Sequence, residues 1–254
     1  MGRKGDSFKR RIYMKIIEKL KKKKMHRTSE DSITVVCLGD SVTEGCFEAY
    51  IDENGNVATV FDRNHSYAEV LKALLARLYP TVQVNIVNSG VSGDSAAGGV
   101  KRLARDVLRF QPDLVIVSYG LNDCGGGYDG LPAYEAALSE IFEKVTQSGA
   151  EVIFLTENCM CTYVSPHLSE ERLRETAEWL MDKQSKGFLD AYFDKAKEVA
   201  ARYGVKVCDL YSVWKSMQES GINVTELLAN KLNHPIREYH CYIAVKLFET
   251  MMEP

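Results

Sequence analysis

The chain has 254 residues with a hydrophobic content of 45%, enough to bury a large core, and its length suits a single α/β domain. It contains no run of 18 apolar residues, so we expect no transmembrane helix. The seven Cys are scattered, and Cys159-x-Cys161 has no second pair at metal-binding spacing, which excludes a disulfide framework and a zinc site and favours the cytoplasm.

The formal net charge of −3 hides an uneven distribution of charge along the chain. Residues 1–27 carry twelve Lys or Arg against two acidic residues, whereas the remainder carries 20 basic and 33 acidic side chains. Within residues 8–20, Ile12, Ile16 and Leu20 recur at four-residue steps, which predicts an amphipathic helix with a basic back. Charged residues interrupt its apolar positions, so it does not resemble a signal peptide.

We therefore divide the chain into a basic extension with a polar linker, residues 1–31, and a single domain, residues 32–254. Three roles fit the amphipathic helix. It packs on the domain or on a second subunit of a homodimer, or it contacts an anionic membrane surface, as basic amphipathic helices do. Nucleic-acid binding is the third role, and we expect none because the acidic body would repel phosphate.

Strand-like apolar runs alternate with helical patterns through the rest of the chain. This alternation predicts a parallel sheet covered on both faces, and hence a flavodoxin-like three-layer α/β/α sandwich with a five-stranded, mostly parallel sheet. The long connections 46–65 and 157–185 are expected to be loops that wall a substrate cleft. The expected strands are 33–38, 82–87, 114–118, 151–155 and 205–210, and the expected helices are 66–79, 99–110, 131–148, 186–203, 211–220 and 237–252.

The first expected strand runs into Gly39-Asp40-Ser41, and a Ser at the carboxyl edge of a parallel sheet is well placed to act as a nucleophile. The segment is not the Gly-x-Ser-x-Gly elbow of α/β-hydrolases, because Thr43 stands at the second glycine position. A Ser followed three residues later by Glu44 is also typical of a capping box, so a helix N-cap is the structural alternative for Ser41.

Four blocks in order along the chain resemble those of the SGNH, or GDSL-type, ester hydrolases. The resemblance extends over roughly residues 33–252, and the last block has the form found in carbohydrate esterases of that family. The first three blocks follow expected strands, where open α/β sheets place their sites. The blocks are Gly39-Asp40-Ser41-Val42-Thr43-Glu44-Gly45, Asn88-Ser89-Gly90-Val91-Ser92-Gly93, Gly120-Leu121-Asn122-Asp123 and Asn233-His234-Pro235.

The resemblance implies that Ser41 is the nucleophile. A Ser hydroxyl needs a base within hydrogen-bond reach, and the resemblance implies His234 for that role. His240 and His167 are the reserve candidates. The backbone N–H of Ser41, the backbone N–H of Gly90 and the side-chain amide of Asn122 are implied as donors to the oxyanion.

Two acidic residues of the blocks, Asp40 and Asp123, are expected to support the site without belonging to the triad. Members of the family place an Asp three residues before the His, but this chain has Lys231 there. We expect His234 to be oriented by a backbone carbonyl of the segment 230–233, which begins at Asn230, or by Glu226, the nearest upstream acid. We favour the carbonyl, and hence a Ser–His dyad.

The sequence thus predicts a serine ester hydrolase that acts on small acyl esters, with an O-acetylated carbohydrate as the first substrate to test. A lipid-directed esterase or acyltransferase is the second hypothesis, because of the basic extension. A non-catalytic protein that binds a sugar or nucleotide is the third, because of the missing Asp. The chain has no glycine-rich nucleotide fingerprint, and we expect no cofactor and no metal.

Overall fold

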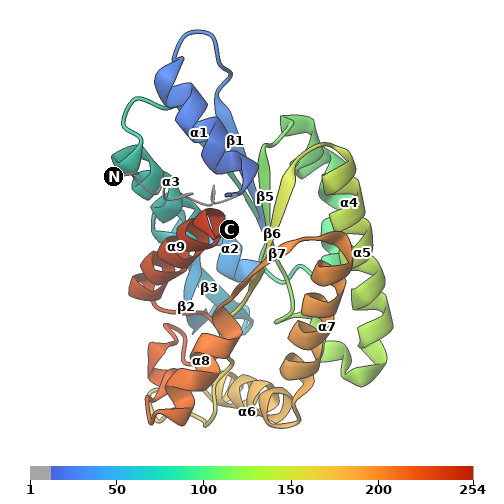
Figure 1. The fold of residues 1–254 in the computed structure, drawn as a ribbon. Helices are drawn as coiled ribbons and strands as arrows, with labels where there is room; N and C mark the ends of the chain where they lie inside the picture. The colour runs from blue at the N-terminus through green and yellow to red at the C-terminus, as the bar shows by residue number, and fades with distance from the viewer. Residues whose placement is uncertain (1–12, 254) are drawn as a thin grey trace, which may run out of the picture.

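Five parallel strands form the central sheet of the structure, a computed structural model that describes residues 13–253 (Figure 1). Along the sheet they lie in the order β4-β1-β5-β6-β7, and each neighbouring pair is parallel. In chain order the arrangement is 2-1-3-4-5, which is flavodoxin-like. The expected sheet is therefore confirmed, with strands β1 (Ile33–Gly39), β4 (Val84–Gly90), β5 (Leu114–Ser118), β6 (Glu151–Thr156) and β7 (Lys206–Asp209).

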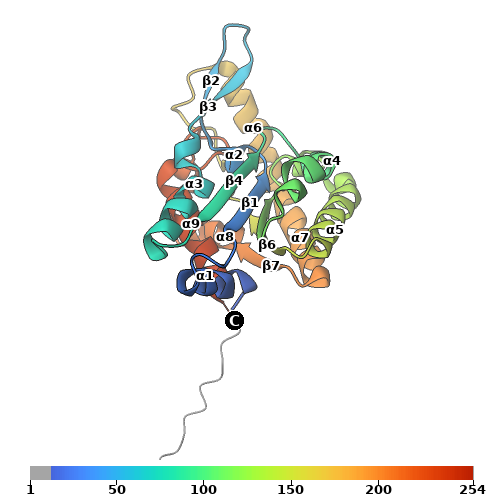
Figure 2. The ribbon, with the colours of Figure 1, turned by 90° about the horizontal axis from the view of Figure 1, so that it is seen from above.

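Helices cover both faces of this sheet and complete the expected three layers (Figures 1 and 2). On one face α3 (Tyr67–Leu78) packs against α9 (Arg237–Met252), and on the other α5 (Leu131–Gln147) packs against α4 (Ala96–Asp106) and α7 (Phe188–Tyr203). The remaining described helices are α1 (Lys15–Met25), α2 (Ser41–Glu44), α6 (Glu171–Ser185) and α8 (Leu210–Glu219), with 3-10 turns η1 (Arg63–His65), η2 (Leu108–Phe110), η3 (Asp123–Gly126), η4 (Tyr128–Gly130) and η5 (Val224–Leu227).

The order of the strands fixes where a site can form. From β4 on one side of β1, the chain continues through α4 to β5 on the other side of β1. At such a switch point the connections diverge and leave a crevice at the carboxyl ends of β1 and β5. Ser41 follows β1 and Asn122 follows β5, so two of the expected site residues stand at this crevice.

Two stretches that we expected to be loops contain regular structure. Residues 46–65 fold into a hairpin of β2 (Cys46–Ile51) and β3 (Val57–Phe61), which projects beyond the sheet (Figure 2). Its turn is closed by Asp52, whose Oδ1 accepts hydrogen bonds from two backbone N–H groups of the turn at 2.8 and 2.9 Å. The second half of 157–185 is α6. Both expectations were wrong because each stretch is only partly buried, and its apolar pattern is correspondingly weak.

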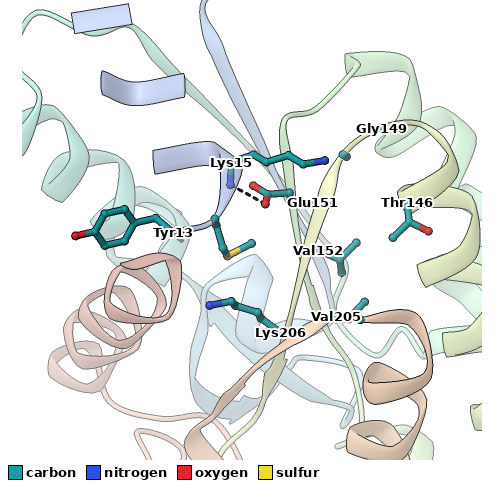
Figure 3. A pocket seen from close by; sticks show the side chains of 11 residues that line it. Tyr13, Lys15, Thr146, Gly149, Glu151, Val152, Val205 and Lys206 are labelled. Carbon is teal, nitrogen blue, oxygen red and sulfur yellow. Dashed lines mark hydrogen bonds between the residues drawn. The ribbon is translucent and has the colours of Figure 1, made fainter. Parts of the chain in front are cut away.

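The amphipathic helix of the extension packs on the domain itself. Ile16, Ile17 and Leu20 of α1 are buried in the common core, while residues 8–12 of the expected helix lie outside the described residues. The carboxylate of Glu151, at the start of β6, accepts a hydrogen bond from the N–H of Lys15 at 2.7 Å (Figure 3). It accepts another from the N–H of Ile16 at 2.8 Å. An anionic cap suits a helix N-terminus, so the domain fixes both the face and the end of α1.

None of the helices within residues 13–253 combines the length and the apolar character that crossing a bilayer requires. Across the same residues, no three side chains of His, Cys, Asp or Glu gather as a metal ion would require. The Cys residues are free thiols, six of them buried, and only Cys241 is exposed.

Candidate active site

Ser41 is the first residue of α2, and Asp40 is the N-cap of that helix. The Asp40 Oδ1 accepts a hydrogen bond from the N–H of Val42 at 3.0 Å, as an N-cap carboxylate does. Glu44, the expected partner in a capping box, instead accepts a hydrogen bond from the N–H of Ser92 at 2.6 Å. The cap is therefore Asp40 rather than Ser41, and the Ser41 hydroxyl is left for another partner.

The glycines on either side of this turn are required by its geometry. A Cβ added to Gly39 would lie 2.1 Å from Thr43 Oγ1 and 2.7 Å from the carbonyl oxygen of Ser118, closer than any side chain allows. Gly45 ends α2 with φ of +95°, in the left-handed region that favours glycine. A four-residue helix between these glycines presents Ser41 at the carboxyl edge of the sheet.

The structure brings Ser41 and His234 together, although they are 193 residues apart in the sequence. The Nε2 atom of His234 lies 2.9 Å from Ser41 Oγ, and its Nδ1 atom lies 3.1 Å from the carbonyl oxygen of Phe47. A carbonyl oxygen only accepts hydrogen bonds, so the proton of the neutral imidazole is on Nδ1. This tautomer leaves the Nε2 lone pair free to accept the Ser41 hydroxyl proton.

The acceptor that orients His234 is a backbone carbonyl, but it comes from β2 and not from the segment 230–233. In that segment Asn230 shapes the loop: its Oδ1 accepts hydrogen bonds from the N–H groups of Leu232, Asn233 and His234 at 2.9 to 3.0 Å. The carbonyl oxygens of Leu232 and Asn233 accept hydrogen bonds from the Cys161 N–H and the Asn158 amide, each at 2.8 Å, and neither pairs with His234 Nδ1. The expected source of the carbonyl was therefore wrong.

Within the described residues, no hydrogen bond joins Glu226 to His234. Its carboxylate is exposed, accepts a hydrogen bond from Lys231 Nζ at 2.8 Å and accepts another from the hydroxyl of Tyr163 at 2.9 Å. These partners lower the pKa of Glu226, with the Lys231 contact as the largest cause. Glu226 thus belongs to a surface ion pair.

Phe47 is itself held by two side chains from α9. Its ring is fully buried, 4.9 Å from the ring of His240 and 4.2 Å from the guanidinium of Arg237. Arg237 in turn binds the carboxylates of Glu48 and Asp62, at 2.5 and 2.8 Å. The carbonyl that orients the imidazole is therefore anchored between α9 and the hairpin.

The reserve candidates for the base lie away from Ser41. His240 is fully buried and accepts a hydrogen bond from the N–H of Tyr67 at Nδ1, at 3.0 Å. His167 is exposed and lines a separate hollow of the surface beside the cleft.

Burial lowers the pKa of His234 to about 4, because a charged imidazolium loses hydration there, and the carbonyl of Phe47 opposes this only in part.

Two of the three expected oxyanion donors are engaged in the free protein. The N–H of Gly90 donates to Asn88 Oδ1 at 3.0 Å. A Cβ on Gly90 would lie 2.2 Å from the backbone nitrogen of Glu44, so this glycine allows β4 to pack against α2. The amide nitrogen of Asn122 donates to Asp40 Oδ2 at 3.0 Å and to the carbonyl of Asp94 at 2.8 Å.

Buried acids lie beneath the nucleophile. Asp40 is fully buried, and burial raises its pKa to about 6. Asp123 accepts a hydrogen bond from the N–H of Ala96 at 3.0 Å, and burial raises its pKa to about 7. Glu157 is 2% exposed and accepts a hydrogen bond from the N–H of Leu121 at 3.1 Å. The sequence analysis missed Glu157, although it follows β6 directly and its position at a strand end could have marked it.

Arg102, also missed, joins the carboxyl ends of β1 and β4. Its guanidinium donates to the carbonyl oxygens of Gly39 and Ser89, at 2.9 and 2.6 Å, and to Asp94 Oδ2 at 2.7 Å. β1 precedes the nucleophile, and β4 ends within the second glycine-rich block. Arg102 therefore fixes the two segments relative to each other.

A cavity of about 520 Å³ opens beside the Ser–His pair, and His234, Asn122 and Ser92 line its inner end. Aromatic side chains of the hairpin and of α6 form its outer wall, and they are about half exposed: Tyr50 at 49%, Phe61 at 55% and Trp179 at 49%. The two stretches that we expected to wall a cleft thus do line this cavity, as a hairpin and a helix.

Comparison with known proteins gives consistent matches. The profile of the GDSL-like Lipase/Acylhydrolase family matches residues 37–240. An acetylxylan esterase from Geobacillus stearothermophilus is 27% identical over 128 residues, which are 47% of this chain and 57% of that protein. The esterase TesA of Pseudomonas aeruginosa is 28% identical over 124 residues, 48% of this chain and 53% of that protein. The chain spans about half the length of these curated relatives.

Among solved structures, a catalytic mutant of Axe2, an acetylxylan esterase from Geobacillus stearothermophilus, superposes with a TM-score of 0.63. The sequence identity is 17%, and the superposition covers 87% of this chain and 95% of that one, so the likeness is one of fold. The profile match begins within β1 and ends within α9, so it covers more of this chain than the alignment with either curated relative does. On that match the chain belongs to the GDSL-like lipase/acylhydrolase family.

Proposed function

We propose that this protein is a serine ester hydrolase that acts on small acyl esters through an acyl-enzyme at Ser41. The observation that carries the proposal is the 2.9 Å contact between Ser41 Oγ and His234 Nε2, with the imidazole held in the tautomer that a general base needs. The cavity beside this pair supplies room for an ester next to the hydroxyl.

In the proposed reaction His234 Nε2 takes the proton of Ser41 as Oγ attacks the acyl carbon. The imidazolium then returns this proton to the departing alkoxide, and the acyl group stays on Ser41. A water molecule, deprotonated by the same Nε2, attacks the acyl carbon. The bond to Ser41 Oγ then breaks, the imidazolium returns its proton to Oγ, and the acid is released. The dipole of the Phe47 carbonyl stabilises the transient imidazolium, as a carboxylate does in a triad, but with a partial charge only.

The proposed oxyanion hole differs from our expectation in one donor. Ser41 N–H has no acceptor among the described residues and adjoins the reacting oxygen. Because the N–H of Gly90 is engaged by Asn88, we assign the second backbone donor to Gly93, whose N–H has no partner among those residues. Gly93 has φ of +78°, is open to solvent and follows Ser92, which lines the cavity. Asn122 contributes by exchanging one of its present acceptors for the oxyanion.

The proposed alcohol component is an acetylated carbohydrate. Exposed aromatic faces, such as those of Trp179 and Tyr50, pack well against the apolar face of a sugar ring. The relative from Geobacillus stearothermophilus is named for activity on acetylxylan, which supports a short acyl group and a sugar. A series of p-nitrophenyl esters tests the acyl length: acetate should be the best substrate. Rates that rise with chain length would favour a lipid-directed enzyme.

Labelling with a fluorophosphonate tests the nucleophile directly. The parent should become labelled, and Ser41→Ala should abolish both labelling and esterase activity while the protein stays folded. Ser185→Ala, an exposed Ser of α6, is the matched control. His234→Ala should be as inactive as Ser41→Ala, and the double variant barely worse, because the pair acts as one unit. An unlabelled but folded parent would instead favour a non-catalytic binding protein.

A further inference from the structure

Glu157 is a buried acid for which the proposed reaction has no use. It stands directly after β6, at the same edge of the sheet as Ser41 and Asn122. Its Oε2 accepts a hydrogen bond from the N–H of Leu121, the residue before Asn122, at 3.1 Å. Its Oε1 is buried and receives no hydrogen bond from a described N–H group or hydroxyl, and no Lys or Arg of the described chain pairs with it. A carboxylate in that position would be an unpaired buried charge, which is strongly unfavourable.

The second partner of Glu157 is Asp40, which is fully buried and precedes the nucleophile. The two carboxyl groups influence each other: Asp40 raises the pKa of Glu157, and Glu157 lowers the pKa of Asp40. Two neighbouring buried carboxyl groups do not both ionise, so one of them keeps its proton. Asp40 already accepts hydrogen bonds from Val42 N–H and from the Asn122 amide, both at 3.0 Å. These donors favour the charged form of Asp40, so the proton belongs to Glu157.

We propose that Glu157 is a positioning residue: as a neutral acid it donates its O–H to Asp40 and thereby fixes the contact between Asp40 and Asn122 beside the nucleophile. Through Leu121 it also fixes the backbone of the Asn122 loop. One side chain thus ties together the turn that presents Ser41 and the loop that presents the amide. The role rests on the proposed function, since Asn122 acts there on the oxyanion.

The electrostatic surroundings support a neutral Glu157. Burial raises its pKa well above the usual range for a carboxyl group, and the charge of Asp40 raises it further. Asp123 on η3 also disfavours a second negative charge there. Asp94, in the loop before α4, faces Asp40, but its charge is already paired with Arg102 at 2.7 Å. The guanidinium of Arg102 is thus engaged by Asp94 and Asp106 and forms no described salt bridge with Glu157.

Two substitutions test the role. In Glu157→Gln the amide still donates to Asp40, and its carbonyl still accepts from Leu121, so kcat for p-nitrophenyl acetate should stay within a few-fold of the parent. Glu157→Leu has a similar size and neither hydrogen bond. Its kcat should fall about 10²-fold with little change in KM, the scale expected when a reacting group is misplaced by about 1 Å. Equal losses in the two variants would overturn the proposal.

The pH profile separates positioning from a merely structural role. In the parent, deprotonation of Glu157 at alkaline pH should lower kcat, because its O–H then no longer reaches Asp40. Glu157→Gln cannot lose that proton, so this alkaline decline should be absent from its profile. An identical decline in both proteins would overturn the proposal even if Glu157→Leu does not fold.

Infrared spectroscopy keeps this test independent of the proposed function. At neutral pH the difference spectrum of the parent minus Glu157→Gln should show the carbonyl stretch of a protonated carboxylic acid, because Asp123, whose pKa is about 7, contributes its own band to both proteins. A parent with that band but without esterase activity would refute the proposed function and leave the neutral Glu157 established. An active parent without the band would refute the role of Glu157 alone.

Discussion

The imidazole of His234 is oriented by the backbone carbonyl of Phe47, 3.1 Å from its Nδ1 atom. Nothing in the described chain offers a carboxylate at that nitrogen. The carbonyl fixes the tautomer and the ring as a triad Asp does, but it brings no full negative charge to the imidazolium. The structure therefore supports the dyad that the absence of Asp at position 231 suggested, with an acceptor from a different part of the chain.

This relationship predicts that Glu226→Gln leaves kcat for p-nitrophenyl acetate within a few-fold of the parent. Glu226 pairs with Lys231 on the surface, and the substitution removes only that exposed ion pair, which contributes at most about 1 kcal/mol to stability. Steady-state kinetics and circular dichroism check the result. A fall of about 10⁴ in kcat, the scale seen when a triad carboxylate is neutralised, would refute the dyad.

A second prediction concerns the support of Phe47. Arg237→Met removes the guanidinium that lies on the Phe47 ring and binds Glu48 and Asp62, so the carbonyl of β2 should lose its fixed position. We expect kcat to fall about 10-fold or more with KM nearly unchanged, since misplaced groups act on the chemical step. Arg105→Met, which removes an exposed Arg of α4 bound only to Asp106, is the matched control. Equal kcat values in both variants would contradict this role.

Most of the fold could be predicted because its signals are local. The strands of the sheet are apolar runs with sharp ends, and 114–118 matches β5 residue for residue. The hairpin β2–β3 was missed because its strands are short and half exposed, although Asn54-Gly55 in its turn is a strong hairpin signal. The strand expected at 82–87 begins at Val84 and extends to Gly90, because its pairing with β1 continues to the glycine.

The sequence could predict the groups of the site that are side chains, but not those that belong to the backbone. Ser41, His234 and Asn122 stand in recognisable blocks, and the structure brings Ser41 and His234 into contact. The carbonyl of Phe47 has no sequence signature, because every residue has one. Gly90 illustrates the opposite difficulty: its block marks it, but only the structure shows that its N–H is already engaged by a side chain.

The pH dependence of the reaction should reflect the burial of His234. Burial disfavours the imidazolium and lowers its pKa to about 4, so the neutral base persists well below the ordinary His value of about 6.5. On the acid side, kcat/KM for p-nitrophenyl acetate should therefore be half-maximal near pH 4. Brief assays after a pH jump separate this limb from unfolding. A midpoint near 6, the pKa of Asp40, would assign the limb to that carboxyl and contradict the prediction.

The last prediction distinguishes a donor to the oxyanion from a residue that binds substrate. The amide of Asn122 is held in place by Asp40 and by the carbonyl of Asp94, and in the proposed reaction it exchanges one of these acceptors for the oxyanion. Asn122→Ala should lower kcat by about 10²–10³ with little change in KM, because the amide meets charge that develops only in the transition state. Asn85→Ala, at the amino end of β4, is the control and should be neutral. If KM rises while kcat stays constant, Asn122 serves binding, and the hole is built from backbone N–H groups alone.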